Sequence, residues 1–214
     1  MRQLQIEVSG LEPGARLLAP AGMCSPENAV SATTVTGGDI VTVALEPELG
    51  LTALWIEAAS ETVTLTHTIS PAPKDQGYPE AVYTSRINRY TVAADDLAEA
   101  SRTIAAKAGG GRAGIDALVA EAEARFSYDH PEARFNDGAE AVPYLSCGTT
   151  PGSCVDINTY LVASLRAAGY EAGYVYGYFF PAEKGGATHD MHCWVAPRHA
   201  GEVLDWDIAH HMKA

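Results

Sequence analysis

Three kinds of side chain in the last third of the sequence could together carry out thiol chemistry. Cys154 is followed by His192, and His192 is followed by two carboxylates, Asp205 and Asp207. A cysteine attacks a carbonyl carbon as its thiolate, a histidine accepts the thiol proton and later returns it to the leaving group, and a carboxylate orients the histidine ring. These residue types, in this order, predict a cysteine nucleophile with a histidine base.

The residues around Cys154 predict the start of a helix. A Pro-Gly pair interrupts the chain, Ser153 is a favoured N-cap residue, and Asp156 stands three positions after it, as in a capping box. The apolar spacing continues up to Gly169, which is a typical helix stop. A cysteine in a first helical turn lies near unpaired N–H groups and the positive end of the helix dipole, so its pKa is lowered. The N–H of Cys154 is also expected to stabilise an oxyanion.

Strands are expected after this helix. Residues 172–180 are rich in aromatic side chains, and residues 191–196 alternate in a way that is typical of a strand. This alternation places His192 and Cys193 on opposite faces, so the two side chains are not expected to serve one site. A further strand is predicted at residues 203–208.

The predicted strand at 203–208 carries both candidate carboxylates. Asp205 and Asp207 are two positions apart and therefore share one face, beside apolar neighbours. Strand alternation alone leaves either of them able to orient His192.

The sequence before residue 86 differs in character from the sequence after it. We predict a β-sandwich-like domain at 1–85 and a second domain at 86–214, separated near a proline-rich polar segment at 70–79. The strands expected in the first domain are 4–8, 30–35, 40–45, 51–56 and 63–69. Two helices, 94–107 and 115–126, are expected to open the second domain, and the apolar face of the latter comprises Ile115, Leu118, Val119 and Ala122.

Charge and hydropathy exclude several classes of partner. The chain carries 27 acidic and 14 basic side chains, a formal net charge of -13. A surface that neutralises many phosphates is therefore not expected, and neither nucleic acid nor membrane is a predicted partner. No apolar run approaches the roughly 20 residues of a membrane span, and the N-terminus lacks an apolar signal segment, so we expect a cytoplasmic location. The sequence does not indicate an oligomeric state.

The thiols and histidines do not match a metal-binding motif. Four cysteines are too few for a disulfide scaffold in 214 residues. Cys147 precedes a loop instead of a helix and is the weaker candidate nucleophile. No C-x-x-C or H-x-x-x-H spacing occurs among the candidate ligands, which are Cys147, Cys154, His189, His192, Cys193, His210 and His211. We therefore predict no metal and no cofactor, and expect the last two histidines to lie on the surface.

Taken together, these segments resemble the transglutaminase-like superfamily of cysteine enzymes, in particular bacterial members of cysteine protease type. The resemblance covers residues 115–212 approximately. It rests on a Tyr-Asp turn after a helix at 124–129 and on four motifs: Gly152-Ser153-Cys154-Val155-Asp156, Leu165-Arg166-Ala167-Ala168-Gly169-Tyr170, His192-Cys193-Trp194-Val195 and Leu204-Asp205-Trp206-Asp207.

This resemblance implies a papain-like α+β core, in which the helix bearing the cysteine packs on an antiparallel sheet bearing the histidine and the aspartate. It implies that Cys154 is the nucleophile, that His192 is the general base and acid, and that an aspartate orients His192. We favour Asp207 over Asp205 by its distance from His192 along the chain. The implied function is hydrolysis of, or acyl transfer from, an amide or peptide bond through a thioester, with a peptide, protein or small amide as substrate. The alternative is a binding module of the same fold without catalysis.

Overall fold

A computed structural model describes residues 2–47, 50–74, 76–83, 87–180 and 182–212. The chain divides into two compact units, Met1–Ala81 and Val82–Ala214, which we call unit 1 and unit 2. The predicted boundary between residues 85 and 86 lies outside the described residues, as does Asp75 of the predicted linker. Within the described ranges, no helix combines the length and apolarity needed to cross a bilayer.

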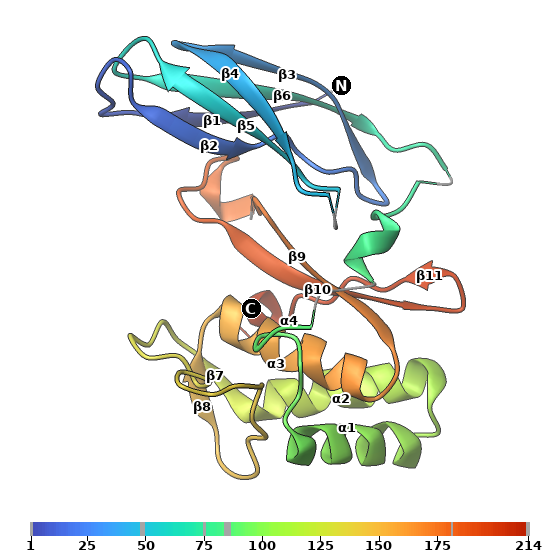
Figure 1. Cartoon of the computed structure of the whole chain (residues 1–214). Helices are drawn as coiled ribbons and strands as arrows, with labels where there is room; N and C mark the ends of the chain where they lie inside the picture. Colours follow the sequence, from blue (N-terminus) through green and yellow to red (C-terminus); the bar gives the residue numbers. More distant parts are fainter. Residues whose placement is uncertain (1, 48–49, 75, 84–86, 181, 213–214) are drawn as a thin grey trace. The chain divides into compact units, whose positions relative to one another are not determined.

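Unit 1 consists of two antiparallel three-stranded sheets (Figure 1). One sheet has the order β1–β6–β3 and the other the order β2–β5–β4. The strands are β1 (Arg2–Val8), β2 (Arg16–Pro20), β3 (Asn28–Thr36), β4 (Gly38–Leu45), β5 (Thr52–Ala58) and β6 (Val63–Pro71). Five of them overlap the strands predicted from the sequence. Strand β2 was not predicted, because its short run Leu17-Leu18-Ala19 shows no alternation of polar and apolar residues.

Alternating side chains of β5 and β6 form the apolar core of unit 1. Leu54, Ile56, Val63 and Leu65 are buried in one cluster that includes residues of both sheets. His67 continues the buried face of β6, and its Nδ1 lies 2.8 Å from Thr33 Oγ1. Burial lowers the pKa of His67. This histidine is therefore a satisfied core residue, in keeping with its isolated position in the sequence.

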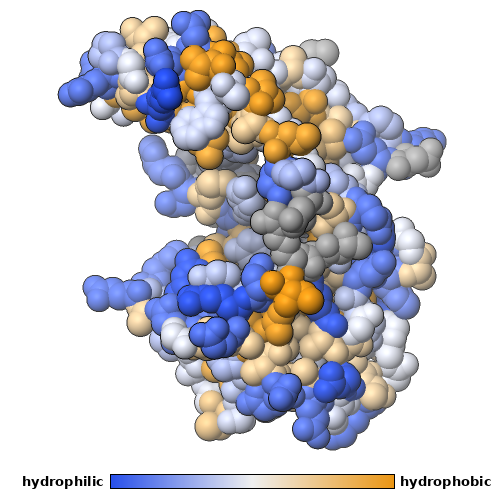
Figure 2. Space-filling view, viewed as in Figure 1, coloured by the Kyte–Doolittle hydropathy of each residue, from blue (hydrophilic) through white to orange (hydrophobic). Residues whose placement is uncertain are grey.

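Large apolar side chains are also exposed on unit 1. Figure 2 shows apolar surface over the part of unit 1 where β4 and β5 lie in Figure 1. The exposed residues belong to β2, β4 and β5 and are Leu18, Ile40, Val41, Val43, Leu45 and Trp55. None of these residue types can act as a nucleophile or an acid–base group, so this surface carries no thiol chemistry.

Unit 2 places one helix between a pair of helices and a sheet (Figure 1). Helix α3 (Cys154–Ala167) contacts α1 (Asp95–Lys107) and α2 (Gly111–Arg125) on one side. On its other side it contacts the antiparallel strands β9 (Glu171–Gly177) and β10 (His192–His199). Nearly the whole circumference of α3 is buried. Helix α3 is therefore packed between two helices and an antiparallel sheet.

The helices of unit 2 follow the sequence signals closely. In α2, the predicted apolar face is buried, but the helix begins at Gly111, four residues before the predicted start. Gly110 precedes it with a φ of 70°, a conformation that glycine adopts without a steric penalty. Helix α3 begins at Cys154 as predicted. It ends before Gly169, whose φ is 88° and whose N–H donates to Arg166 O at 3.0 Å.

The shorter elements of unit 2 lie around these. They are the 3-10 turns η1 (Glu80–Val82, at the junction of the units) and η2 (Ala182–Lys184), the parallel strands β7 (Phe126–Tyr128) and β8 (Thr150–Gly152), strand β11 (Glu202–Val203) and helix α4 (Ile208–His211).

The prediction of one strand at 203–208 was wrong. Only Val203 of that range belongs to β11, Trp206 makes an isolated antiparallel bridge with Val195, and Asp207 is the N-cap of α4. Asp207 Oδ1 accepts a hydrogen bond from the N–H of His210 at 3.0 Å. This cap favours a helical turn over continued strand pairing at this point.

Candidate active site

The start of α3 is held by its own N-cap. Ser153 donates to Asp156 Oδ2 from its N–H at 2.9 Å and from its hydroxyl at 2.8 Å. The predicted capping box is therefore present. Cys154 is the first residue of the helix, so its N–H has no hydrogen-bond partner within the helix and points out from its N-terminus.

The segment before Cys154 is fixed against the end of α2. Strand β8 pairs in parallel with β7, with Tyr128 opposite Gly152, and the N–H of Asp129 donates to Gly152 O at 3.0 Å. Gly152 also packs closely on Phe126, because a Cβ atom added there would lie 2.7 Å from Phe126 Cδ1. Glycine is needed here for close approach, and this approach sets the position at which α3 begins.

His192 and Asp207 form a hydrogen-bonded pair. His192 Nε2 lies 2.8 Å from Asp207 Oδ2, and the two side chains are 13% and 28% exposed. The bridge between Trp206 and Val195 positions the aspartate, since Trp206 N–H donates to Val195 O at 2.8 Å and Trp206 O accepts from Val195 N–H at 3.0 Å. With Nε2 occupied, Nδ1 is the ring nitrogen that is available to Cys154.

The surroundings of Cys154 favour its thiolate. A hydrogen bond from the Cys193 thiol is the largest influence that lowers the pKa of Cys154. Burial opposes this, and a hydrogen bond and the positive charge of His192 lower the pKa further. The net direction is downward, which agrees with the position of the residue at a helix N-terminus.

The pKa values of His192 and Asp207 shift in the directions of an ion pair. The hydrogen bond to Asp207, followed by that to Cys154, raises the pKa of His192 from its ordinary value of 6.5 to about 9. Burial raises the pKa of Asp207, but the hydrogen bonds from His192 and the His210 N–H together bring it below its ordinary value. At neutral pH the favoured form is thus a thiolate, an imidazolium and a carboxylate.

Cys193 lies beside Cys154, contrary to expectation. The alternation of β10 does place the side chains of His192 and Cys193 on opposite faces. Cys193 is only 2% exposed and packs against α3, where Asn158 Nδ2 donates to its sulfur at 3.4 Å, one helical turn after Cys154. The two side chains on opposite faces of β10 nevertheless share one neighbour, because both lower the pKa of Cys154. Only His192 lines the cleft described below.

A cleft of about 590 Å³ opens at Cys154 and His192. It is lined by residues from the α2–α3 connection, the start of α3, the segment before β10, and α4: Tyr128, His130, Pro131, Glu132, Arg134, Ser153, Cys154, Val155, Asp156, Phe179, Lys184, Thr188, Asp190, Met191, His192 and His210. A substrate that enters this cleft therefore reaches Cys154 from the side of the helix N-terminus.

Phe179 and His210 line the cleft although neither was predicted to belong to the site. The ring of Phe179 lies 5.6 Å from that of His192 and 4.7 Å from that of His210. His211 is strongly exposed, with 75% of its side chain accessible, whereas His210 is half-buried and lines the cleft. The sequence signal for both was weak. His210, for example, reaches the cleft only through the fold of α4.

Two further predicted candidates, Cys147 and Asp205, are not among the residues that line this cleft, and both are exposed. The remaining cysteine, Cys24, belongs to unit 1. All four cysteines are free thiols. Among the described residues, no group of three or more His, Cys, Asp and Glu side chains is arranged to hold a metal ion.

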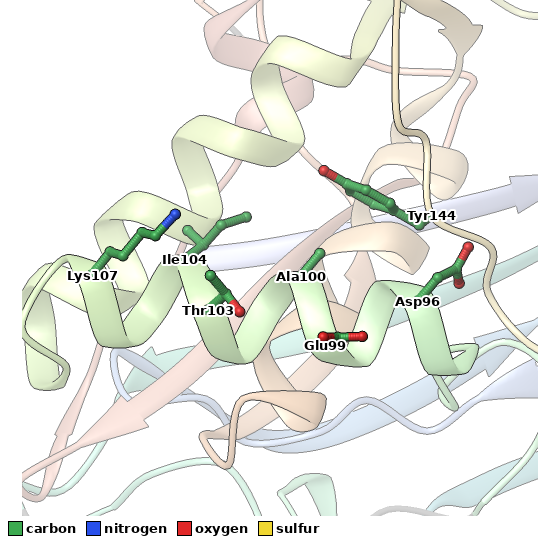
Figure 3. A pocket seen from close by; sticks show the side chains of 7 residues that line it. All are labelled: Asp96, Glu99, Ala100, Thr103, Ile104, Lys107 and Tyr144. Carbon is green, nitrogen blue, oxygen red and sulfur yellow. The ribbon is translucent and has the colours of Figure 1, made fainter.

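A second pocket, of about 410 Å³, lies along α1 (Figure 3). Side chains of α1 line it from Asp96 to Lys107, and Tyr144 lies over them from a separate segment. The pocket is lined by neither cysteine nor histidine. Of these two pockets, only the cleft at Cys154 is lined by cysteine and histidine.

Comparison with known sequences is consistent with this arrangement. Residues 98–202 match the family model of the transglutaminase-like superfamily, described as its core. The matched segment includes Cys154 and His192 and ends before Asp207. No curated protein sequence matches the chain.

Solved structures share the fold at low sequence identity. A putative cysteine protease from Cytophaga hutchinsonii superposes with a TM-score of 0.63 at 12% identity, covering 97% of this chain and 75% of that one. The periplasmic domain of TgpA from Pseudomonas aeruginosa gives a TM-score of 0.50 at 17% identity, covering 98% and 76%. Its ethylmercury-bound form gives 0.49 at 17% identity, covering 96% and 77%. Unit 2 of this chain contains a domain of the transglutaminase-like superfamily.

Proposed function

We propose that this chain is a thiol-dependent hydrolase of amide or peptide bonds, or an acyltransferase, and that Cys154 is its nucleophile. The observation that carries the proposal is the His192–Asp207 pair, joined at 2.8 Å, next to a cysteine at the first residue of a helix. The lowered pKa of Cys154 and the raised pKa of His192 support a thiolate–imidazolium pair at neutral pH.

In the first half of the proposed reaction, the Cys154 thiolate attacks the carbonyl carbon and a C–S bond forms. The carbonyl oxygen becomes an oxyanion, and the N–H of Cys154 is positioned to donate to it from the helix terminus. The imidazolium of His192 then gives its proton to the leaving nitrogen, the C–N bond breaks, and a thioester remains on Cys154.

In the second half, an acceptor releases the acyl group. Neutral His192 takes a proton from water or from an amine as that acceptor attacks the thioester, and the thiolate of Cys154 leaves. Asp207 holds the ring orientation and stabilises the imidazolium in both halves. Water is always present, so we take hydrolysis as the principal reaction and transfer to an amine as its variant.

The cleft supports a peptide, a protein segment or a small amide as substrate. It offers the apolar rings of Tyr128 and Phe179 together with charged groups of both signs, including Arg134 and Asp190. Such a mixture suits an amide with polar and apolar side groups better than a purely apolar ligand.

The first test of the proposal is the reactivity of Cys154. The full chain and its Cys154→Ala, His192→Ala and Cys147→Ala variants are alkylated with iodoacetamide from pH 5 to pH 9, and the adduct is located by peptide mass. We expect fast modification of Cys154 at pH 6, slowed in His192→Ala and unchanged in Cys147→Ala. If Cys154 is alkylated slowly, with the pH dependence of an ordinary thiol and at the same rate in His192→Ala, the result would favour the binding module without catalysis.

The second test is the acyl-enzyme. p-Nitrophenyl acetate supplies an acetyl group, and intact mass is followed with and without an added primary amine. We expect one acetyl group on Cys154, its loss with time, and none on the Cys154→Ala variant at that position. Faster loss in the presence of the amine, with acetylated amine as product, identifies acyl transfer, whereas an unchanged rate identifies hydrolysis. An absence of acetylation at Cys154 contradicts the thioester mechanism.

A further inference from the structure

A second thiol is buried behind the proposed nucleophile, and the reaction described above does not use it. Cys193 is the second residue of β10 and faces α3. Asn158 Nδ2 donates to Cys193 O at 2.8 Å and to Cys193 Sγ at 3.4 Å. The hydroxyl of Tyr174 also hydrogen-bonds this thiol. Two polar side chains, from α3 and β9, therefore hold the Cys193 sulfur in place.

The sulfur held in this way lies next to the sulfur of Cys154. Asn158, which donates to the Cys193 sulfur, stands one helical turn after Cys154 on the same face of α3, and both cysteines belong to one buried cluster. The influence of each thiol on the pKa of the other agrees with this proximity. Cys154 opens onto the cleft, whereas Cys193 is 2% exposed. The pair thus combines a thiol that is accessible to a small molecule in the cleft with a thiol that is buried behind it.

We propose that Cys193 is a resolving thiol, which forms a disulfide with Cys154 after a hydroperoxide has oxidised Cys154. The inference rests on the proposed function only in taking Cys154 as a thiolate, and it does not require that the chain hydrolyse an amide. The site is thus a modification site built from α3 and β10.

The chemistry is two consecutive displacements. The Cys154 thiolate attacks one oxygen of the hydroperoxide, an S–O bond forms and the O–O bond breaks, so that the sulfur loses two electrons and Cys154 becomes a sulfenic acid. The other oxygen leaves as hydroxide or alkoxide and takes up a proton, which gives water or an alcohol. The sulfur of Cys193 then attacks the sulfenic sulfur, an S–S bond forms, and the hydroxyl group leaves with the Cys193 proton as water. For hydrogen peroxide, the sum is two thiols and one peroxide giving one disulfide and two waters.

Charge favours this order of events. The hydrogen bond with Cys154, followed by burial, raises the pKa of Cys193, so Cys193 is protonated while Cys154 is a thiolate. Oxidation of Cys154 to the sulfenic acid removes the negative charge beside Cys193. The hydrogen bonds from Tyr174 and Asn158 lower the pKa of Cys193, and after this oxidation only burial still raises it. The second thiol therefore becomes more nucleophilic only after the first has been oxidised.

The consequence would be protection of the nucleophile. A sulfenic acid that remains exposed to peroxide proceeds to a sulfinic acid, which thiols do not reduce. A disulfide can be reduced, and both thiols are then recovered. The pair would switch the site off under peroxide and restore it under reducing conditions.

The experiment uses the full chain with Cys24→Ser and Cys147→Ser, so that only the pair remains. The protein is treated with hydrogen peroxide at pH 7, blocked with N-ethylmaleimide and cut with trypsin without reduction. Cleavage after Arg134, Arg166, Lys184 and Arg198 places Cys154 in peptide 135–166 and Cys193 in peptide 185–198. We expect both titratable thiols to be lost at the same rate. The two peptides should then appear as one disulfide-linked species that dithiothreitol separates.

The matched control is Cys193→Ser in the same background, because serine is similar in size and its hydroxyl can still hydrogen-bond, but it cannot form a disulfide. In this variant we expect a dimedone-reactive sulfenic acid at Cys154, followed by a sulfinic acid that dithiothreitol does not reverse. Dimedone should trap less of the protein that retains Cys193, by about tenfold or more. Thermal unfolding of both proteins checks that the variant is folded.

Two results would overturn the proposal. One is accumulation of sulfenic or sulfinic acid at Cys154 in the protein that retains Cys193, to the same extent as in Cys193→Ser. The other is failure of peroxide to oxidise Cys154 at all. Neither depends on amide hydrolysis, so a chain that forms the disulfide but gives no acyl-enzyme would refute the proposed function and leave this inference standing.

Discussion

Asp207 accepts two hydrogen bonds, one on each carboxylate oxygen: Oδ2 lies 2.8 Å from His192 Nε2, and Oδ1 accepts from the N–H of His210 at 3.0 Å. One side chain thus caps α4 and orients the proposed base. The position of His192 is consequently tied to the fold of the last described helix.

Asp207→Asn should separate these two tasks. Asparagine is as good an N-cap as aspartate, so α4 should be retained. The charge is lost, so the pKa of His192 should fall from about 9 towards 6.5, as followed by the Cε1–H resonance of His192. Loss of base orientation should slow deacetylation by about a hundredfold to ten-thousandfold. The exposed Asp205→Asn is the matched control, and an equal effect of both changes would refute the role of Asp207.

The free energy of unfolding should depend on pH through His192. Folding raises the pKa of this side chain from 6.5 to about 9, so its charged form stabilises the folded state fully below pH 6.5. That contribution is lost as the pH rises through about 9. Urea unfolding of the chain and of His192→Gln should therefore differ by about 1–3 kcal/mol more at pH 6 than at pH 9.5. A difference that does not change with pH would show that the raised pKa is absent.

Asn158 should position the site without touching substrate. Its side chain is fully buried and joins α3 to β10 at Cys193, so Asn158→Ala should cost about 1–3 kcal/mol of stability. It should also slow alkylation of Cys154 at pH 6. Ser164→Ala is the control, because Ser164 is buried in the same helix and its hydroxyl donates to Tyr160 O at 2.8 Å, far from the cleft residues. Equal alkylation rates in both variants would show that Asn158 serves stability alone.

Gly152→Ala should displace the start of α3. The added Cβ would meet Phe126 Cδ1 at 2.7 Å, and relief of this overlap should cost about 1–3 kcal/mol. Because Cys154 follows two residues later, its alkylation at pH 6 should slow as well. Gly77→Ala is the control, since a Cβ there meets nothing within 4 Å. Unchanged stability and reactivity in Gly152→Ala would mean that the helix start tolerates the shift.

The sequence predicted those parts of the site that depend on neighbours along the chain. The start of α3 follows from Gly152, Ser153 and Asp156, whose turn and capping preferences act within a few residues. The burial of α2 follows from the spacing of its apolar residues. For such elements, local preference and tertiary structure agree.

The parts that were missed depend on contacts between distant segments. Strand alternation could not distinguish Asp205 from Asp207, because the chain leaves the strand after Trp206 and turns into α4. The contact of Cys193 with Cys154 was missed because alternation describes one strand and not the helix that crosses it. Asn158 showed no sequence signal, since a single amide inside a helix is recognised only by what it contacts.

The parallel pairing of β7 and β8 has a consequence for how this domain could change. It clamps both ends of residues 129–149 beside the end of α2 and the start of α3, while His130, Glu132 and Arg134 of that excursion face the cleft. Exchange or lengthening of the excursion would alter which molecules fit, yet leave the thiol where it is. We therefore expect variation along this excursion to change the shape of the cleft while the segment that holds Cys154 stays the same.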